Sequence, residues 1–371
     1  MQVLIKTFHG MEEVLAKEVQ AILGRPSEAR KRAVYVDQVT PLELYRLNKQ
    51  LRTALRVLVN TETFTVHSYE DIYKALRTIK WEELFYHHNT ISIDSTVFSP
   101  YFKNSQFVMH KSKDAIVDHF RDLYGKRPSV ERKNANIRIN IHITERKMIV
   151  SLDSSGESLH RRGYKQVQVK APLNEVLAAG LIQLSDWDQQ TAFWDPMCGS
   201  GTIVTEAALL KYNIQSQFKR DEFCFRYWKT FDKKIWQELK REKSSPETLP
   251  SPILGSDIDR DVIFDFEKEL RSNKLQSQID IKKQNFFQIE EQSEPRLLIF
   301  NPPYNKRLGL EDAKGFYKMI GDTLKQKCKG STAWVFSGDK EAIKFVGLRP
   351  SKKIILYNGP IESRFHKFEL F

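Results

Sequence analysis

The sequence contains little cysteine and no long apolar segment, and both shortages limit what the protein can be. Only three of its 371 residues are cysteines, Cys198, Cys224 and Cys328. They are too few and too scattered for a disulfide framework or a zinc site. No apolar run approaches the roughly 18 residues of a membrane span, and MQVLIKTFHG at the start lacks the regions of a signal peptide. We therefore expect a cytoplasmic protein with no metal ion and no membrane partner.

Acidic residues are outnumbered, and unevenly so. The chain has 59 Lys and Arg against 47 Asp and Glu, a net charge of +12. Residues 1–170 have a net charge of +9, whereas residues 171–371 have a net charge of +3. The N-terminal part is thus the better candidate for contact with a polyanion. A solvated basic surface without a partner explains the charge alone about as well.

What the chain does have is a series of alternating strand and helix patterns. QVLIKTF and AVYVD predict strands, and residues 11–23 have apolar side chains at helical spacing. Thr40-Pro41-Leu42-Glu43 combines an N-cap threonine, a proline in the first turn and the glutamate of a capping box. Residues 1–55 therefore predict a small α+β domain.

A second α+β unit is expected over residues 56–155. Residues 105–124 have the pattern of an amphipathic helix with exposed basic side chains. NIRINIHI, residues 136–143, alternates strictly, which places four isoleucines on one face of a strand. MIVSLD predicts the returning strand of a hairpin.

Residues 156–170 show no periodicity and predict a linker. Beyond them, residues 171–371 alternate strands and helices, which is typical of a doubly wound α/β sheet. Residues 213–250 are charged and contain aromatic residues and proline, so we interpret them as an insertion. FCFRYW, residues 223–228, is expected to form the core of that insertion rather than a stacking platform for RNA.

AFWDPMCGSGT, residues 192–202, predicts a strand, a loop with two glycines and a helix. Gly199 and Gly201 carry no side chain, so the backbone there can approach a ligand closely. The third glycine of the dinucleotide pattern GxGxxG is replaced by Val204, which disfavours a tight pyrophosphate fit. Asp195, at the end of the strand, suits a ligand with a positively charged amino group.

ILGSDIDRD, residues 253–261, ends a second strand with Asp257, whose carboxylate can accept both hydroxyls of a ribose. A carboxylate for an amine, a carboxylate for a ribose and neutral loop glycines fit S-adenosylmethionine better than NAD. Turn glycines and helix-capping aspartates remain the alternative for either motif taken alone.

RLLIF is followed by Asn301-Pro302-Pro303-Tyr304, although a strand rarely runs into two prolines. The Asn301 side-chain oxygen and the Pro302 carbonyl can each accept one N–H of a nucleobase amine and so direct its lone pair toward a methyl group. The Tyr304 ring can stack on the base. The motif predicts methylation of adenine N6, cytosine N4 or guanine N2 without choosing among them, and a rigid turn is the structural alternative.

Five segments together resemble the THUMP-domain RNA methyltransferases: NSQFVMHKSKDAIVDHF, LHRRGY followed by APLNEVLAAGL, DPMCGSGT, GSDID and NPPYNKRLG. Within that family the chain is most similar to bacterial enzymes that methylate guanine N2 in 23S ribosomal RNA. The resemblance implies a ferredoxin-like domain (1–55), a THUMP RNA-binding domain (56–155) and a Rossmann-like methyltransferase domain (171–371) with a seven-stranded, mostly parallel sheet. It implies S-adenosylmethionine as the methyl donor and 23S ribosomal RNA, free or in a pre-ribosomal particle, as the partner.

The resemblance also assigns site residues. Asn301 to Tyr304, with Pro302 and Pro303, correspond to the clamp on the target base. Asn285 stands where the family usually has an acidic residue facing the adenine amine, and Asn305 replaces the glycine after NPPY. A second methyltransferase half, found in some relatives, is not expected within this chain. The expected cofactor contacts are Asp195, Met197, Gly199, Gly201, Thr202, Asp257, Ile258, Asn285 and Phe286.

Several basic residues are candidates for phosphate contacts, with interdomain salt bridges or solvated charges as an equal alternative. His87 and His88 are adjacent and are expected at the surface, not as metal ligands. The candidates are Lys111, Lys113, Arg161 and Arg162.

The leading hypothesis is a guanine-N2 methyltransferase acting on 23S ribosomal RNA. A transfer RNA guanine methyltransferase is close to it, because THUMP domains also recognise that RNA. An N6-adenine DNA methyltransferase would share NPPY but leaves residues 1–170 without a role. A non-catalytic RNA-binding assembly factor is the reading from another class, and Asn285 is the one feature that favours it.

Overall fold

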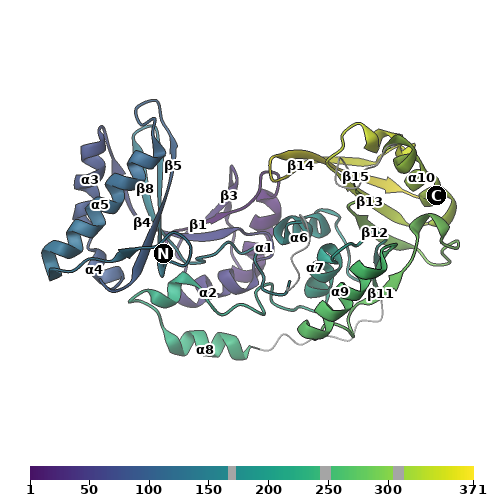
Figure 1. Ribbon diagram of the computed structural model, residues 1–371, viewed down its shortest axis with the longest axis horizontal. Coiled ribbons are helices and arrows are strands. Elements are labelled where there is room, and N and C mark those ends of the chain that lie inside the picture. Colours follow the sequence, from purple (N-terminus) through teal and green to yellow (C-terminus); the bar gives the residue numbers. More distant parts are fainter. Residues whose placement is uncertain (166–172, 243–251, 304–312) are drawn as a thin grey trace. The chain divides into compact units, whose positions relative to one another are not determined.

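The computed structural model describes residues 1–165, 173–242, 252–303 and 313–371. These residues form two compact units, whose elements are labelled in Figure 1. The first unit consists of Met1–Thr7, Ala16–Leu159 and Arg220–Glu242. The second unit consists of Phe8–Leu15, His160–Lys219 and Lys243–Phe371. Helix α1 (Glu12–Leu23) therefore counts partly in each unit.

The first unit is built on an eight-stranded sheet in the order β2-β3-β1-β4-β8-β7-β5-β6. Neighbouring strands are antiparallel, except that β5 pairs in parallel with both β6 and β7. The strands are β1 (Val3–Lys6), β2 (Glu28–Arg30), β3 (Ala33–Val36), β4 (Arg56–Thr65), β5 (Thr90–Phe98), β6 (Ser129–Val130), β7 (Ile137–Thr144) and β8 (Lys147–Asp153). Its helices are α2 (Pro41–Gln50), α3 (Tyr69–Thr78), α4 (Trp81–Leu84), α5 (Ser105–Tyr124), the short 3-10 helix η1 (Cys224–Tyr227) and α8 (Lys233–Arg241).

Local sequence signals account for much of this unit. Thr40 caps α2 and forms the predicted capping box with Glu43. Helix α5 has the bounds that its apolar pattern predicts. The four alternating isoleucines of β7 are all buried, and β8 returns antiparallel to it. These expectations are confirmed.

The second unit is a seven-stranded sheet in the order β11-β10-β9-β12-β13-β15-β14. Pairs from β11 to β13 are parallel, and β15 is antiparallel to both β13 and β14. The strands are β9 (Ala192–Asp195), β10 (Ile253–Asp257), β11 (Asp280–Lys283), β12 (Arg296–Phe300), β13 (Thr332–Ser337), β14 (Lys352–Asn358) and β15 (Ile361–Glu369). The described helices are α6 (Glu175–Leu184), α7 (Thr202–Lys211), α9 (Arg260–Asn273), η2 (Phe286–Gln288), α10 (Ala313–Lys327) and η4 (Ala342–Val346).

Both faces of this sheet are covered, as a doubly wound fold requires. Strand side chains alternate between two cores: Phe193 and Ile299 pack with helices α6, α7 and α9, whereas Trp194 and Phe300 pack with α10, η2 and η4. The helices lie in Figure 1 around the parallel strands that they cover. The predicted fold class, a mostly parallel seven-stranded sheet after α+β domains, is confirmed.

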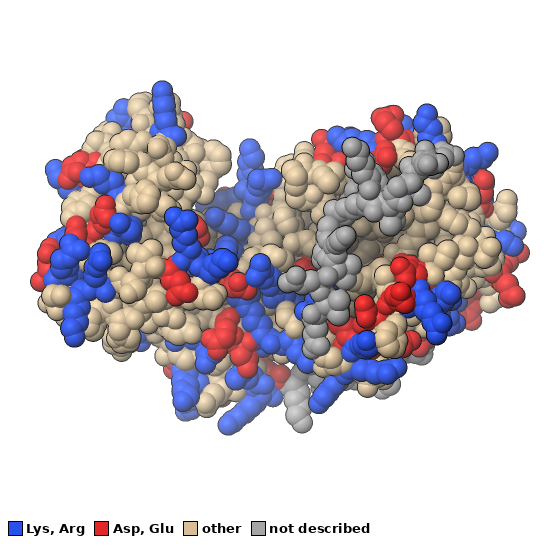
Figure 2. All heavy atoms as spheres, viewed as in Figure 1, with Lys and Arg blue, Asp and Glu red and all other residues tan. Residues whose placement is uncertain are grey.

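The face of the molecule shown in Figure 2 carries charges of both signs. On the side of the molecule seen in Figure 2, Lys and Arg side chains alternate with Asp and Glu side chains over both units. Some basic side chains of the first unit form ion pairs with acidic neighbours, as in Arg77–Asp122 and Lys111–Glu70. Net charge alone therefore does not locate a polyanion surface.

Residues 220–242 leave the second unit and pack in the first. The Arg220 guanidinium donates to the backbone carbonyls of Ser155 at 2.6 Å, Glu157 at 3.0 Å and Ser158 at 3.3 Å. Burial lowers the pKa of Arg220 to about 10. FCFRYW is largely buried here, as expected, with the Phe225 ring stacked on Tyr45 at 4.4 Å. The predicted insertion is thus partly a component of the first unit.

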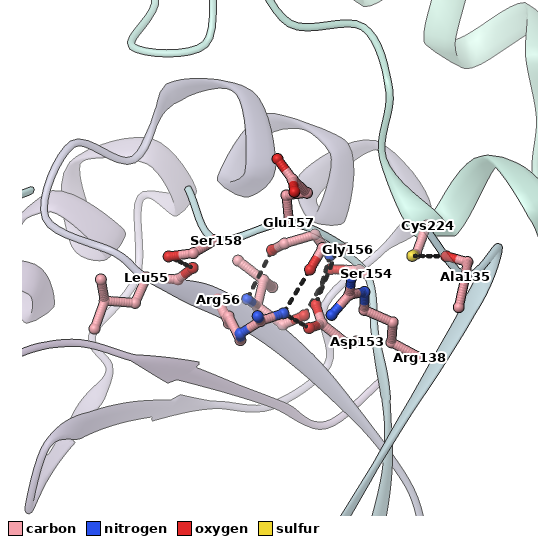
Figure 3. A network of polar contacts seen from close by, with 12 residues as sticks. Leu55, Arg56, Ala135, Arg138, Asp153, Ser154, Gly156, Glu157, Ser158 and Cys224 are labelled. Atoms are coloured by element: carbon pink, nitrogen blue, oxygen red, sulfur yellow. Dashed lines mark hydrogen bonds and ion pairs between the residues drawn. The ribbon is translucent and has the colours of Figure 1, made fainter. Parts of the chain in front are cut away.

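Residues 156–165 are more than the linker that was expected. Figure 3 shows the turn after β8, where Arg56 bonds the Asp153 carboxylate and the Gly156 carbonyl. The Ser158 hydroxyl donates to the Leu55 carbonyl at 3.2 Å, and the Cys224 thiol donates to the Ala135 carbonyl. This segment is fixed by hydrogen bonds because polar backbone groups must be paired when buried. Residues 166–170 of the expected linker lie outside the described residues.

Candidate active site

Three adjacent parallel strands end at the residues that the sequence singles out. Strand β9 ends at Asp195, β10 ends at Asp257, and Asn301 follows the last residue of β12. Strand β9 lies between the other two, with Asp195 opposite Gly255 and Trp194 opposite Leu298. Asp257 and Asn301 thus lie at the carboxyl edge on either side of Asp195. Ligands of open α/β sheets bind at this kind of position, where the strand order reverses.

The Asp257 carboxylate organises the loops at this edge. One oxygen accepts the Gly199 backbone amide at 2.9 Å, and the other accepts the Asp259 amide at 3.0 Å. The Cys198 amide donates to the Ser256 carbonyl at 2.9 Å, which adds a second tie between the same loops. Each carboxylate oxygen keeps a further lone pair for a hydroxyl. The proposed contact of Asp257 with a ribose therefore stays a prediction that the geometry allows.

The two loop glycines differ in what surrounds them. Both have positive φ, 51° at Gly199 and 70° at Gly201, which favours glycine. A Cβ on Gly201 would lie 2.0 Å from the Phe266 ring, whereas a Cβ on Gly199 would meet no atom of the described residues within 4 Å. Gly201 is thus required by packing of the protein itself, and Gly199 faces open space that a ligand could use.

Asp195 is a buried acid with little compensation. It is 1% exposed, and its carboxylate accepts the Met197 amide at 3.2 Å. Burial raises the pKa of Asp195 well above its usual range, the Met197 amide opposes that rise, and the negative charge of Asp257 adds to it. A cationic group placed beside it would favour the charged carboxylate.

The remaining expected cofactor contacts surround this edge with apolar and polar groups. Ile258 is 62% exposed directly after β10, so its apolar side chain is accessible to a ligand at this edge. The Asn285 amide oxygen accepts the Phe287 amide at 3.0 Å, so it caps η2 and keeps one lone pair. Met197 is partly buried, and Phe286 belongs to the core beneath. The Thr202 hydroxyl accepts from Lys165 at 2.6 Å.

Asn301 has a buried acceptor without a donor. Its Oδ1 atom is buried and makes no hydrogen bond with any of the described residues. Pro302 is buried and Pro303 is half-buried. Tyr304 and Asn305 lie outside the described residues. A buried, unpaired amide oxygen costs free energy, on the order of 1–3 kcal/mol, unless a ligand donates to it.

Arg162 is corrected as a phosphate contact. Its guanidinium is 1% exposed and donates to Glu206 at 3.1 Å, and the Tyr164 hydroxyl donates to the same carboxylate at 3.1 Å. The alternative, a buried ion pair, is what the structure shows, although it lies within the second unit. The sequence signal that could have indicated it is the glutamate in the middle of the apolar helix α7.

Arg161 is exposed, and Lys111 and Lys113 are half-buried beside Glu70 and Asp114. These three stay predictions. Cys198 is buried, and burial raises the pKa of its thiol well above the usual range, so it is not an activated nucleophile.

The described residues contain neither a candidate membrane span nor a candidate metal site. No helix among them is both long enough and apolar enough to cross a bilayer. No group of three or more His, Cys, Asp or Glu side chains among them is arranged to hold a metal ion.

Comparison with known proteins identifies the class. Residues 162–367 match the RMKL-like methyltransferase domain, residues 66–153 match the THUMP domain, and residues 2–58 match the RlmL ferredoxin-like domain. The chain belongs to the RMKL-like methyltransferase family. It is a THUMP-containing methyltransferase, which confirms the family and the enzyme class expected from the sequence motifs.

Two relatives show how far the similarity extends. A protein named as an RNA methyltransferase of Synechocystis sp. is 40% identical over 331 residues, which cover 88% of this chain and 86% of the relative. The ribosomal RNA large subunit methyltransferase K/L of Marinomonas sp. is 34% identical over 373 residues, which cover 97% of this chain and 52% of the relative. The chain thus spans about half the length of that relative.

Solved structures share the whole architecture. A methyltransferase crystallised with S-adenosylhomocysteine is 25% identical, with a TM-score of 0.87 over 100% of this chain and 98% of the other. A protein titled an N6-adenine-specific DNA methylase, from Listeria monocytogenes, is also 25% identical, with a TM-score of 0.88 over 100% and 96% of the two chains. The expected cofactor class is confirmed by the first of these, because S-adenosylhomocysteine is the demethylated form of S-adenosylmethionine.

The substitution Asp195→Asn should stabilise the ligand-free protein while weakening the binding of S-adenosylmethionine. Burial raises the pKa of Asp195, so the folded protein favours the protonated carboxyl group. The carboxyl group therefore costs no stability below the pKa of an aspartate in the unfolded chain. Stability falls as pH rises from there through the raised pKa of the folded protein. We expect the variant to gain about 1–2 kcal/mol in free energy of unfolding at pH 7. The gain should shrink toward pH 4, as measured by urea denaturation.

Asp188→Asn provides the control. Backbone amides, chiefly that of Thr191, lower the pKa of Asp188, so its substitution should not stabilise the protein. An Asp195→Asn variant that is less stable than the wild type at pH 7 would contradict our account of the buried carboxyl group.

Proposed function

We propose that this protein transfers a methyl group from S-adenosylmethionine to the exocyclic N2 amine of a guanine in 23S ribosomal RNA. The observation that carries the proposal is the Asn301 Oδ1 atom, buried and without a donor among the described residues, beside strands that end in Asp195 and Asp257. Such an atom fits one N–H of a nucleobase amine. The Pro302 carbonyl would accept the other.

The residues at the carboxyl edge fit the methyl donor. The Asp195 carboxylate would face its amino group, Asp257 its ribose, Ile258 and Phe286 its adenine, and the open side of Gly199 its amino-acid portion. When bound, S-adenosylmethionine supplies a methyl group on a positively charged sulfonium. Met197 and Thr202 border the same loop, and the Asn285 amide would serve the adenine amine through its remaining lone pair.

Asn301 and Pro302 would act by orienting the amine. An exocyclic amine shares its lone pair with the base ring, and two fixed acceptors favour the geometry in which that pair points outward. The amine nitrogen forms the bond to the methyl carbon as the bond from carbon to sulfur breaks. Its N–H becomes acidic only after transfer and is then lost to solvent, so no side-chain base is required beforehand. Tyr304 would stack on the base.

Ribosomal RNA as substrate is supported by the relatives named for the large ribosomal subunit and by the THUMP match at residues 66–153. Lys111, Lys113 and Arg161 remain candidates for phosphate contacts on this RNA. A pre-ribosomal particle is the alternative form of the substrate. We also propose a cytoplasmic location, which the three free cysteines favour.

The two glycines of the loop should separate cofactor binding from folding. Gly199→Ala places a methyl group where no described atom lies within 4 Å, so it should weaken S-adenosylmethionine binding at least tenfold. Its stability loss should be limited to the about 1–2 kcal/mol that the positive φ costs an alanine. Gly201→Ala should lose about 1–3 kcal/mol more than Gly199→Ala, because its Cβ would overlap the Phe266 ring in addition to the cost of a positive φ. Calorimetric titration and thermal denaturation measure the two effects. Equal loss of stability in both variants would contradict the assignment of Gly199.

Asn301→Ala should lower the rate of methyl transfer by about 100- to 1000-fold, because one of two fixed acceptors is lost. Cofactor affinity should stay within twofold of the wild type. Stability should not fall, since the Asn301 oxygen has no bond to a described residue to lose. Single-turnover assays with labelled cofactor measure the rate. Substantial residual turnover would show that the acceptor pair does not drive the reaction.

The substrate is tested by incubating the protein with labelled cofactor and unmodified 23S ribosomal RNA, transfer RNA or duplex DNA. We expect label in the 23S RNA alone, released as N2-methylguanosine on digestion. Label in transfer RNA would favour the tRNA guanine methyltransferase, and N6-methyladenine in DNA the activity named for the Listeria neighbour. Cofactor binding failure in every assay would favour the non-catalytic assembly factor.

A further inference from the structure

Four aromatic rings gather at the surface of the first unit, between α4 and β5 and at the end of α5. Tyr86 and His88 are stacked, with centroids 5.2 Å apart and planes 14° from parallel. His87 contacts His88 at 5.6 Å and Tyr124 at 5.5 Å, so the rings form a continuous series. Tyr86 is 47% exposed and Tyr124 is 50% exposed. We call these four residues the ring surface.

The backbone that carries three of the four rings is held by hydrogen bonds. The Tyr86 amide donates to the Asn89 side-chain oxygen at 2.9 Å, and the Asn89 amide donates to the Tyr86 carbonyl at 3.0 Å. Phe85 and Asn89, on either side of the three rings in sequence, are both buried. The Tyr124 ring lies on the buried Phe120 ring at 6.2 Å. Little backbone entropy would be lost when a ligand contacts rings carried on a segment held in this way.

One basic side chain lies against a ring, and two more follow the ring surface in sequence. The Lys229 ammonium lies 4.3 Å from the centroid of the Tyr86 ring, and its backbone amide donates to the Leu84 carbonyl at 2.9 Å. Lys229 belongs to the 220–242 segment, so that segment contributes to the surface. Lys126 and Arg127 follow Tyr124 within three residues and are exposed. None of the three takes part in an ion pair with another described residue.

We propose that the ring surface binds unpaired nucleotides of the RNA substrate, with bases stacked on the rings and phosphates near Lys229, Lys126 and Arg127. Exposed rings next to basic side chains match the chemistry of single-stranded RNA, because every base has a flat face and every linkage a charge. This site is separate from the residues at the carboxyl edge of β9, β10 and β12. It also differs from the Lys111 and Lys113 candidates on α5. The inference rests on the proposed function in that RNA is the substrate.

A purely structural role explains the rings poorly. Buried neighbours Phe85 and Phe120 already provide the apolar contacts of this region. Two tyrosines about half exposed contribute little further burial of apolar area. A protein partner could also cover such rings, but the three basic side chains without ion pairs among the described residues favour a polyanion.

The test measures binding of a fluorescein-labelled single-stranded RNA oligonucleotide, and of the same strand annealed to its complement, by anisotropy. We expect the Tyr86→Ala Tyr124→Ala variant of the full chain to bind the single strand at least tenfold more weakly, since base stacking on a ring contributes about 1–3 kcal/mol. Duplex affinity should change less than threefold. Lys229→Gln should reduce the slope of log affinity against log salt by about 0.7.

Tyr101→Ala is the matched control, because Tyr101 is a tyrosine of the same unit, 51% exposed, with the Arg146 guanidinium 4.1 Å from its ring centroid. It should bind the single strand as the wild type does. Tyr86→Phe Tyr124→Phe keeps both rings and should also retain affinity, which separates stacking from a folding defect. The phenylalanine variant losing as much affinity as the alanine variant would overturn the inference.

The possible failures can be told apart. A wild-type protein that binds single-stranded RNA, with an alanine variant that binds it equally well, would overturn the ring surface and leave the methyltransferase proposal intact. Equal losses on single strand and duplex would also overturn it. If the wild type binds neither RNA, both the ring surface and RNA as substrate are overturned, whereas cofactor binding is still measured separately by calorimetry.

Discussion

The carboxylate of Asp257 is the contact on which the rest of the site depends. It accepts backbone amides from Gly199 and Asp259, so one side chain fixes the loop after β9 and the loop after β10. A hydrogen bond to a charged acceptor is stronger than one between neutral groups, and it holds the glycine loop without filling the space beside it. The positive φ of Gly199 is thereby maintained with its open side toward the carboxyl edge of the sheet. Positions of Asp195 and Asn301 follow from the strands on which they lie.

Around that contact, two buried polar groups of the candidate site have few or no hydrogen-bond partners among the described residues. Asp195 is buried with its pKa raised, and Asn301 keeps a buried oxygen without a described donor. Both conditions cost stability in the ligand-free protein, and both are relieved by groups that a methyl donor and a nucleobase would bring. Such polar groups cluster at functional sites because a bound ligand provides the hydrogen-bond or charge partners that the folded protein lacks. By contrast, the neighbouring Arg162–Glu206 pair is internally satisfied, which is why it is structural.

The first unit includes residues 220–242, which are distant in sequence from the rest of that unit. The Arg220 guanidinium donates to three backbone carbonyls after β8. The Phe225 ring stacks on Tyr45, and the Lys229 ammonium lies over the Tyr86 ring. The same excursion thus stabilises the turn of Figure 3 and contributes a charge to the ring surface. Residues 220–242 thus serve the first unit, whereas the candidate active site lies in the second unit.

Local pattern by itself determined the class of fold and located the strand ends that form the candidate site. The alternation of β7, the capping box of α2, and the motifs ending β9, β10 and β12 are encoded over a few residues, because period, caps and strand ends are local properties. Only the tertiary structure decided which charges are buried. Arg161 and Arg162 are neighbours in sequence, yet one is exposed and the other pairs with Glu206, since the partner comes from a helix more than forty residues away. Likewise, Gly199 and Gly201 cannot be distinguished by the sequence pattern. In the structure the Phe266 ring of α9 packs against Gly201, whereas Gly199 is open to a ligand.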